Sequence, residues 1–245
     1  MQTNRVARIL GIEKPVVQGP LSWLTDARLV AAVGNAGGLG VLGPNAGLTA
    51  ATAVSTPEAT AEKMREEIRK TKQLTEKPFG VNLIPTAEND IWTPAILPVI
   101  KEEGVKVVVY TGYGDGSLKP ALFDELKTAG ITIIYRDINP TPENSRRAEQ
   151  AGADIIVANG LDLRLFRTLP DYYRALPGKL SDKLVAMDRA GASKAELAQA
   201  MGGLRGMRLG MLEGNTDEGY ISLGAGIGNI HAIASVAEVV NQLAV

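Results

Sequence analysis

Short apolar runs alternate with amphipathic segments over the first 158 residues, and this alternation predicts parallel β/α units. The runs lie at residues 15–18, 38–42, 79–84, 105–111, 131–136 and 154–158. Most are continuous runs of Val, Ile and Leu, which is typical of strands buried on both faces of a parallel sheet. We therefore predict six parallel strands that are covered by helices.

Caps and glycines indicate where the intervening helices begin and end. Ser55 and Glu58 have the spacing of a capping box, and Thr141 precedes a proline at the first position of another helix. Glycines stand at the junctions between helices and following strands, at Gly104, Gly130 and Gly152. Such glycines typically end a helix in the left-handed conformation.

The pattern changes after residue 158, where helix signals continue without a buried strand. Capping boxes beginning at Ser193 and Ser235 predict two helices, and the glycine-rich stretch 213–228 predicts a loop or short strand. We predict an α/β protein with a TIM-barrel-like parallel fold. Its six β/α units occupy residues 1–158, and a mostly helical segment, 159–245, packs on this incomplete barrel. A complete eight-stranded barrel has about 250 residues, so the length of the chain would allow eight strands. The sequence nevertheless lacks the signals of strands seven and eight.

Composition and charge exclude several functions. The 26 basic and 27 acidic side chains give a formal net charge of −1, so no bulk charge favours nucleic acid or an anionic membrane. The sequence has no Cys and one His, which leaves no thiol nucleophile and no Cys/His zinc site, and we predict no metal. No apolar run approaches the length of a membrane span, and the first residues do not resemble a signal peptide. We expect a cytoplasmic protein.

Candidate ligand-binding residues fall at the carboxyl ends of the predicted strands, the edge at which β/α barrels place their chemistry. The segment after the first strand forms either a simple turn or a backbone platform for a flat ring; it contains Gln18, Gly19, Pro20 and Leu21. Asn82 lies near the end of the third predicted strand and either caps a loop or bonds a heterocycle. Arg136 ends the fifth, and it either pairs with Asp137 or provides a cation for an anionic ligand.

Two further features favour structural roles. The glycines of the segment 38–43 match G-x-G-x-x-G, but they occupy a strand instead of joining a strand to a helix. We reject a dinucleotide-binding fingerprint and expect close backbone packing there. His231 has no acidic partner in the local sequence, so we interpret it as structural.

Three segments taken together closely resemble the nitronate monooxygenase (2-nitropropane dioxygenase) family, whose pattern the flavin-dependent enoyl-acyl-carrier-protein reductases share. The segments are QGPLSW at 18–23, LVAAVGNAGGLG at 29–40 and KPFGVNL at 77–83. The resemblance runs from about residue 12 to residue 158 and resumes at 212–226.

The resemblance implies an FMN-binding TIM barrel that oxidises nitronates with oxygen or takes electrons from NAD(P)H. It places the segment from Gln18 through Gly19 and Pro20 to Leu21 against the isoalloxazine ring. It also implies that Asn82 contacts the polar edge of the ring and that Arg136 faces the cofactor. The region in which relatives carry a catalytic His, together with strands seven and eight, is missing. We therefore assign no catalytic residue and expect an incomplete phosphate site.

Other functions stay open: an enoyl-acyl-carrier-protein reductase, or a truncated, catalytically impaired member that acts as a binding or assembly protein. A phosphate-binding isomerase or aldolase is disfavoured, because no Lys or pair of carboxylates is suitably placed. An open sheet exposes its edges, so tail helices or a second protomer should cover the gap between the first and sixth strands. We thus expect a homo-oligomer that acts on a small-molecule substrate.

Overall fold

The computed structural model describes residues 4–49, 51–86, 88–112, 117–138, 141–157, 166–167, 172–173, 175, 178–221 and 233–244. The chain divides into two units. The first contains residues 1–48, 52–159 and 234–245, and the second contains residues 49–51 and 160–233. Within the described ranges, no helix combines the length and the apolar character that crossing a membrane requires.

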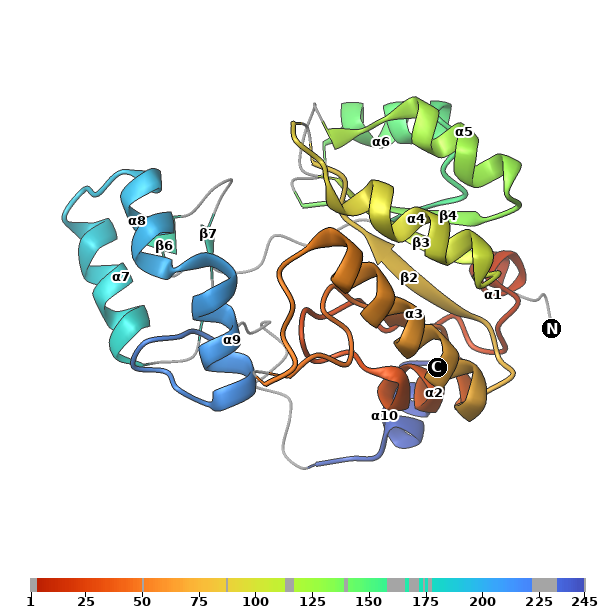
Figure 1. Cartoon of the computed structure of the whole chain (residues 1–245), viewed down its shortest axis with the longest axis horizontal. Coiled ribbons are helices and arrows are strands. Elements are labelled where there is room, and N and C mark those ends of the chain that lie inside the picture. Colours follow the sequence, from red (N-terminus) through yellow and green to blue (C-terminus); the bar gives the residue numbers. More distant parts are fainter. Residues whose placement is uncertain are drawn as a thin grey trace. The chain divides into compact units, whose positions relative to one another are not determined.

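A parallel sheet of five strands forms the centre of the first unit, with neighbouring strands in chain order (Figure 1). The strands are β1 (Gly40–Leu42), β2 (Phe79–Leu83), β3 (Val107–Gly112), β4 (Thr132–Asp137) and β5 (Ile155–Val157). This arrangement confirms the predicted α/β fold. The first predicted strand, 15–18, is reduced to one parallel bridge between Val17 and Leu39. Pro15 begins this segment and Pro20 follows it, and neither proline has an N–H with which to extend the ladder.

Helices connect the strands and cover the sheet (Figure 1). They are α1 (Arg5–Leu10), α2 (Ala27–Asn35), α3 (Pro57–Leu74), α4 (Trp92–Glu102), α5 (Pro120–Thr128) and α6 (Pro142–Gln150). The predicted capping box at Ser55 is wrong. Proline suits the first position of a helix, so α3 begins at Pro57 and Thr56 is its N-cap. The Thr56 side chain accepts a hydrogen bond from Ala59 N at 3.3 Å. Thr141 caps α6 as predicted.

Alternation along the strands separates two apolar clusters. On one face, Val108, Tyr110 and Tyr135 pack with residues of the helices α3 to α6. On the other face, Val109 and Ile134 belong to a cluster that also contains the following residues of β1, β3 and α1: Val41, Val107, Ala7 and Leu10. We call this second face the inner face, because it corresponds to the interior of a barrel. Its apolar cluster fills the lower layers, and polar side chains follow toward the carboxyl ends.

The second unit is mainly helical, with α7 (Lys179–Arg189), α8 (Lys194–Met201) and α9 (Gly203–Glu213). Ser193 forms the predicted capping box of α8. The core of the second unit includes Leu180, Leu184, Leu197, Met201 and Tyr220. A short antiparallel pair, β6 (Phe166–Arg167) and β7 (Tyr172–Tyr173), was not predicted, because strands of two residues carry no periodic signal.

The last helix, α10 (Val236–Leu243), belongs to the first unit and contacts α2 (Figure 1). Ser235 forms the predicted capping box at its start. Lys14 connects the two helices, since its Nζ donates to Asn241 Oδ1 and to the Ala36 carbonyl, both at 2.6 Å. The end of the chain is thus fastened beside the segment that precedes the sheet.

Candidate functional site

Polar side chains from three adjacent strands share the inner face at the carboxyl edge of the sheet. They are Asn82 on β2, Thr111 on β3 and Arg136 on β4. The strand register pairs Asn82 with Val109 and pairs Thr111 with Arg136. Because alternate residues of a strand lie on the same face, Asn82 and Thr111 occupy successive layers of that face. Two of these three residues, Asn82 and Arg136, were predicted to bind the cofactor.

The amide of Asn82 is held in one orientation. Asn82 is only 5% exposed, and its Nδ2 donates to Val109 O at 2.7 Å and to Thr111 Oγ1 at 2.8 Å; a longer contact of 3.3 Å reaches Leu83 O. A backbone carbonyl can only accept, so the nitrogen of the amide must face Val109.

The oxygen of the same amide is left free. Asn82 Oδ1 accepts no hydrogen bond from any residue in the described part of the chain. Asn82 therefore has an acceptor oxygen at this edge that no described residue uses.

Arg136 provides a positive charge on the same face and edge, two strands away from Asn82. Its side chain is half-buried and makes no hydrogen bond or ion pair within the described ranges. Of the two interpretations of Arg136, the ion pair with Asp137 does not form, because adjacent residues of a strand point to opposite faces. Asp137 instead lies on the helix-covered face, where its Oδ2 accepts from Tyr135 Oη at 2.8 Å and from Asn144 Nδ2 at 3.2 Å.

The buried cluster around Asp137 is a structural one. Burial raises the pKa of the Tyr135 phenol well above its usual range, and the hydrogen bond to Asp137 acts in the same direction. Tyr110 lies next to Tyr135, with ring centroids 5.9 Å apart. These groups face away from Arg136, so they leave its guanidinium free to interact with a ligand.

The segment after the first predicted strand is fastened to the end of β1 but leaves a surface open. Gln18 Oε1 accepts from Val41 N at 3.2 Å, and Gln18 Nε2 donates to the carbonyl of Gly19. Apart from its chain neighbours, no described residue has a heavy atom within 4 Å of the position that a Cβ on Gly19 would take. Pro20 is half-buried, and Leu21 is 48% exposed. This geometry suits a backbone platform that a flat group can approach closely.

Thr25 holds the same loop in place. Its Oγ1 donates to Leu21 O at 2.8 Å and accepts from Gly43 N at 3.0 Å. A Cβ on Gly43 would lie 2.5 Å from Thr25 Oγ1, and one on Gly40 would lie 2.4 Å from Val30 O. The glycine pattern at 38–43 therefore serves close packing between backbone segments, as predicted.

Sequence analysis missed Thr111 as a residue of the site. The available signal was a polar residue at the end of the apolar run 105–111. His231 lies outside the described residues, as does the segment 222–232 around it. Among the residues that are described, no cluster of three or more His, Asp or Glu side chains is arranged to hold a metal ion.

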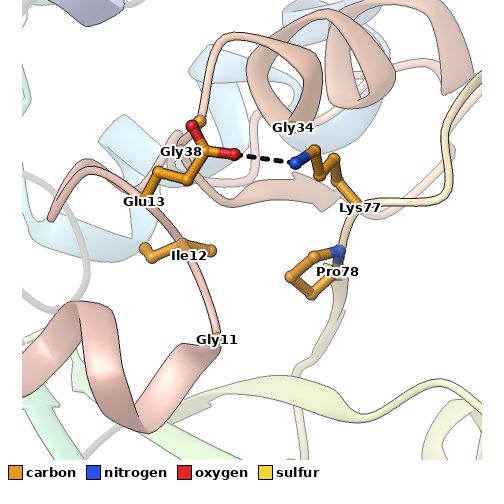
Figure 2. Close-up of a pocket in the computed structure, with 8 residues that line it drawn as sticks. Gly11, Ile12, Glu13, Gly34, Gly38, Lys77 and Pro78 are labelled. Carbon is orange, nitrogen blue, oxygen red and sulfur yellow. Dashed lines mark hydrogen bonds and ion pairs between the residues drawn. The ribbon is translucent and has the colours of Figure 1, made fainter.

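A small pocket lies at the opposite, amino edge of the sheet (Figure 2). Glu13 and Lys77 point toward each other across it, with Oε1 and Nζ 2.7 Å apart, and Ile12 and Pro78 lie along its wall. The hydrogen bond from Lys77 holds the pKa of Glu13 below its ordinary value. The cavity volume of about 20 Å³ has room for about one water molecule, so this pocket cannot hold a cofactor.

Comparison with known proteins matches most of the chain to one family. The family model for nitronate monooxygenase matches residues 3–164. A nitronate monooxygenase of Pseudomonas aeruginosa is 30% identical over 192 residues, which cover 65% of this chain and 51% of the relative. A nitronate monooxygenase of Paraburkholderia phytofirmans is 29% identical over 254 residues, which cover 89% of this chain and 62% of the relative. The chain thus spans about half to three-fifths of the length of these relatives.

Two solved structures share the fold. FabK from Thermotoga maritima superposes with a TM-score of 0.74 at 20% identity, and the match covers 97% of this chain and 93% of that one. A nitroalkane oxidase from Streptomyces ansochromogenes superposes with a TM-score of 0.50 at 25% identity, covering 64% of this chain and 48% of that one.

Proposed function

The chain belongs to the nitronate monooxygenase family, and from this premise we propose that it binds FMN at the carboxyl edge of its sheet and acts as an FMN-dependent oxidoreductase. The observation that carries the proposal is the pairing of a free acceptor with a free cation on that edge, Asn82 Oδ1 and the Arg136 guanidinium. When bound, FMN supplies the electron-transfer chemistry that protein side chains lack.

The residues at this edge match the chemistry of an isoalloxazine ring. Its pyrimidine half carries an N–H between two carbonyls, and Asn82 Oδ1 can accept from that N–H. Arg136 can stabilise negative charge on the same half when the ring gains electrons. Gly19 has no side chain, and among the described residues only its chain neighbours lie near its Cβ position, so it leaves room for the face of the ring. Gln18 and Pro20 hold the platform, and Leu21 offers apolar surface.

The proposed phosphate site is incomplete. This part of the proposal rests on the described portion of the main sheet, which has five strands and one bridge and no seventh or eighth strand. We therefore expect FMN and riboflavin to bind with affinities within about ten-fold of each other, because few charge-assisted hydrogen bonds reach the phosphate. A preference for FMN above about a hundred-fold would instead indicate a complete phosphate site.

Absorption spectroscopy of the purified protein, followed by titration with FMN, tests flavin binding directly. We expect Arg136→Met to weaken FMN binding about ten-fold and to lower the midpoint potential of the bound flavin, since a positive charge beside the ring is lost. Arg146→Met is the matched control, because Arg146 is exposed on α6 and pairs with Glu143 at 2.8 Å. A protein that takes up no flavin in excess FMN would refute the proposal.

We propose small nitronates as substrates, with NAD(P)H as a second source of electrons. Anaerobic mixing with NADH or NADPH, and aerobic turnover of a simple alkyl nitronate, distinguish these routes. The described portion of the main sheet has no seventh or eighth strand, and this favours a second candidate, a catalytically impaired binding or assembly protein. Stable flavin binding without reduction or turnover would support that candidate.

The proposed homo-oligomer is supported by the sheet edge. β5 pairs with β4 alone within the described ranges, and its Ile156 is 37% exposed. An apolar residue on an unpaired edge strand favours association with a second copy. Size-exclusion chromatography with light scattering tests this expectation, and a monomer at micromolar concentration would contradict it.

A further inference from the structure

We propose that Thr111 is a positioning residue that makes Asn82 a pure acceptor, so that the site selects a ring edge carrying an N–H over one that does not. The inference rests on the proposed flavin function and deepens it. It assigns a role to a residue that sequence analysis did not select.

The two protons of the Asn82 amide are both in use. An amide NH₂ has two donors, and Asn82 directs them to Val109 O at 2.7 Å and Thr111 Oγ1 at 2.8 Å. Neither proton remains for a ligand, so the amide offers only Oδ1. The reversed amide would direct Oδ1 against the Val109 carbonyl, and two acceptor oxygens repel each other.

The position of Thr111 follows from the strand register. Asn82 pairs with Val109, and Thr111 lies two residues farther along β3 on the same face. Such diagonal neighbours are within reach of each other's side chains. Thr111 is 2% exposed, and its branched side chain has few rotamers, so its hydroxyl is held in place.

Removing the Thr111 hydroxyl changes what Asn82 offers. In Thr111→Val, the amide keeps its bond to Val109 O and its longer contact with Leu83 O, but it loses the bond to the hydroxyl. Asn82 Oδ1 is then less firmly directed at the N–H of the ring, so discrimination between ring edges falls. Valine has nearly the same shape as threonine and suits a strand, so the variant preserves the packing of β3.

Methylation of the flavin at N3 replaces the N–H of the ring edge and provides the matched ligand. Affinities are measured by fluorescence titration of FMN and 3-methyl-FMN into the wild type, Thr111→Val and Thr111→Ser. We expect the wild type to prefer FMN at least about ten-fold, Thr111→Val to reduce that preference about five-fold, and Thr111→Ser to retain it. Equal weakening of both ligands in Thr111→Val, or an unchanged preference, would overturn the inference.

The orientation of Asn82 is also measured in the protein without ligand, which separates this inference from the proposed function. The side-chain amide protons of Asn82 are followed by NMR in wild type and Thr111→Val. We expect one of them to exchange with solvent faster in the variant. A wild type that binds neither flavin would refute the proposed function, whereas unchanged exchange of both protons would refute the role of Thr111.

Discussion

Replacing Gly40 by alanine tests whether the glycines of β1 serve packing or ligand binding. A Cβ at Gly40 would lie 2.4 Å from Val30 O and 2.6 Å from Val30 Cα, which are backbone atoms of α2. Unstrained contacts between carbon atoms are about 3.5–4.0 Å, so α2 must move away by about 1 Å. The same substitution at Gly19 meets no heavy atom of a described residue within 4 Å, apart from its chain neighbours.

The expected cost follows from what α2 buries. Four residues of α2 are at most 3% exposed: Ala27, Val30, Ala31 and Val33. A shift of about 1 Å removes up to half of the dispersion energy across such a contact, and overpacking typically costs about 1–3 kcal/mol. Because the clash is with backbone, we expect Gly40→Ala to lower the free energy of unfolding by about 3 kcal/mol. Gly19→Ala should change it by less than about 0.5 kcal/mol.

Tryptophan emission during urea unfolding measures this difference in the first unit. The chain has two tryptophans, Trp23 and Trp92, and both belong to that unit. With a slope of about 2 kcal/mol per molar urea, the midpoint of Gly40→Ala falls by about 1.5 M. Gly19→Ala should keep the wild-type midpoint and instead weaken FMN binding. A wild-type midpoint for Gly40→Ala would refute the packing argument, because α2 would then move without cost.

Three other measurements test the structure. Burial alone would raise the pKa of Glu103, but hydrogen bonds from Arg69 and Arg65 hold it below 4.5. Above pH 4.5, wild type should therefore be about 1 kcal/mol more stable than Glu103→Gln. This difference should vanish as the pH falls through the lowered pKa of Glu103. A difference in urea midpoint that does not change with pH would contradict this. Burial raises the pKa of Tyr110, whose Oη donates to Ser117 O at 2.6 Å, to about 12. Because the unfolded chain ionises first, Tyr110 alone should lower stability above pH 10 by up to about 1.4 kcal/mol per pH unit. Tyr110→Phe should lessen the total slope in urea titrations followed by circular dichroism, and equal slopes would count against this. Ser235 Oγ accepts from Glu238 N at 3.3 Å, so Ser235→Ala should destabilise α10 by about 1 kcal/mol and speed its amide exchange. The control variant Ser193→Ala should leave α10 unchanged. Undiminished amide protection of α10 in Ser235→Ala would exclude a capping role.

The location of the candidate site could be predicted from the sequence because it depends on chain order and strand polarity. Asn82 and Arg136 each end an apolar run, and in a parallel sheet all such ends meet at one edge. The partners of these side chains could not be predicted in this way. Thr111 was overlooked because its bond to Asn82 crosses between strands, and no local spacing indicates such a bond.

Local periodicity in the sequence determined the alternation of strands and helices, the caps at Thr141, Ser193 and Ser235, and the edge on which polar residues gather. These features depend on interactions between residues close in the chain, so the sequence alone indicates them. Only the tertiary structure decided that Asp137 bonds Tyr135 and leaves Arg136 free, and that α10 returns to α2. Those outcomes depend on register between strands and on packing between distant segments, which are set when the helices close over the sheet.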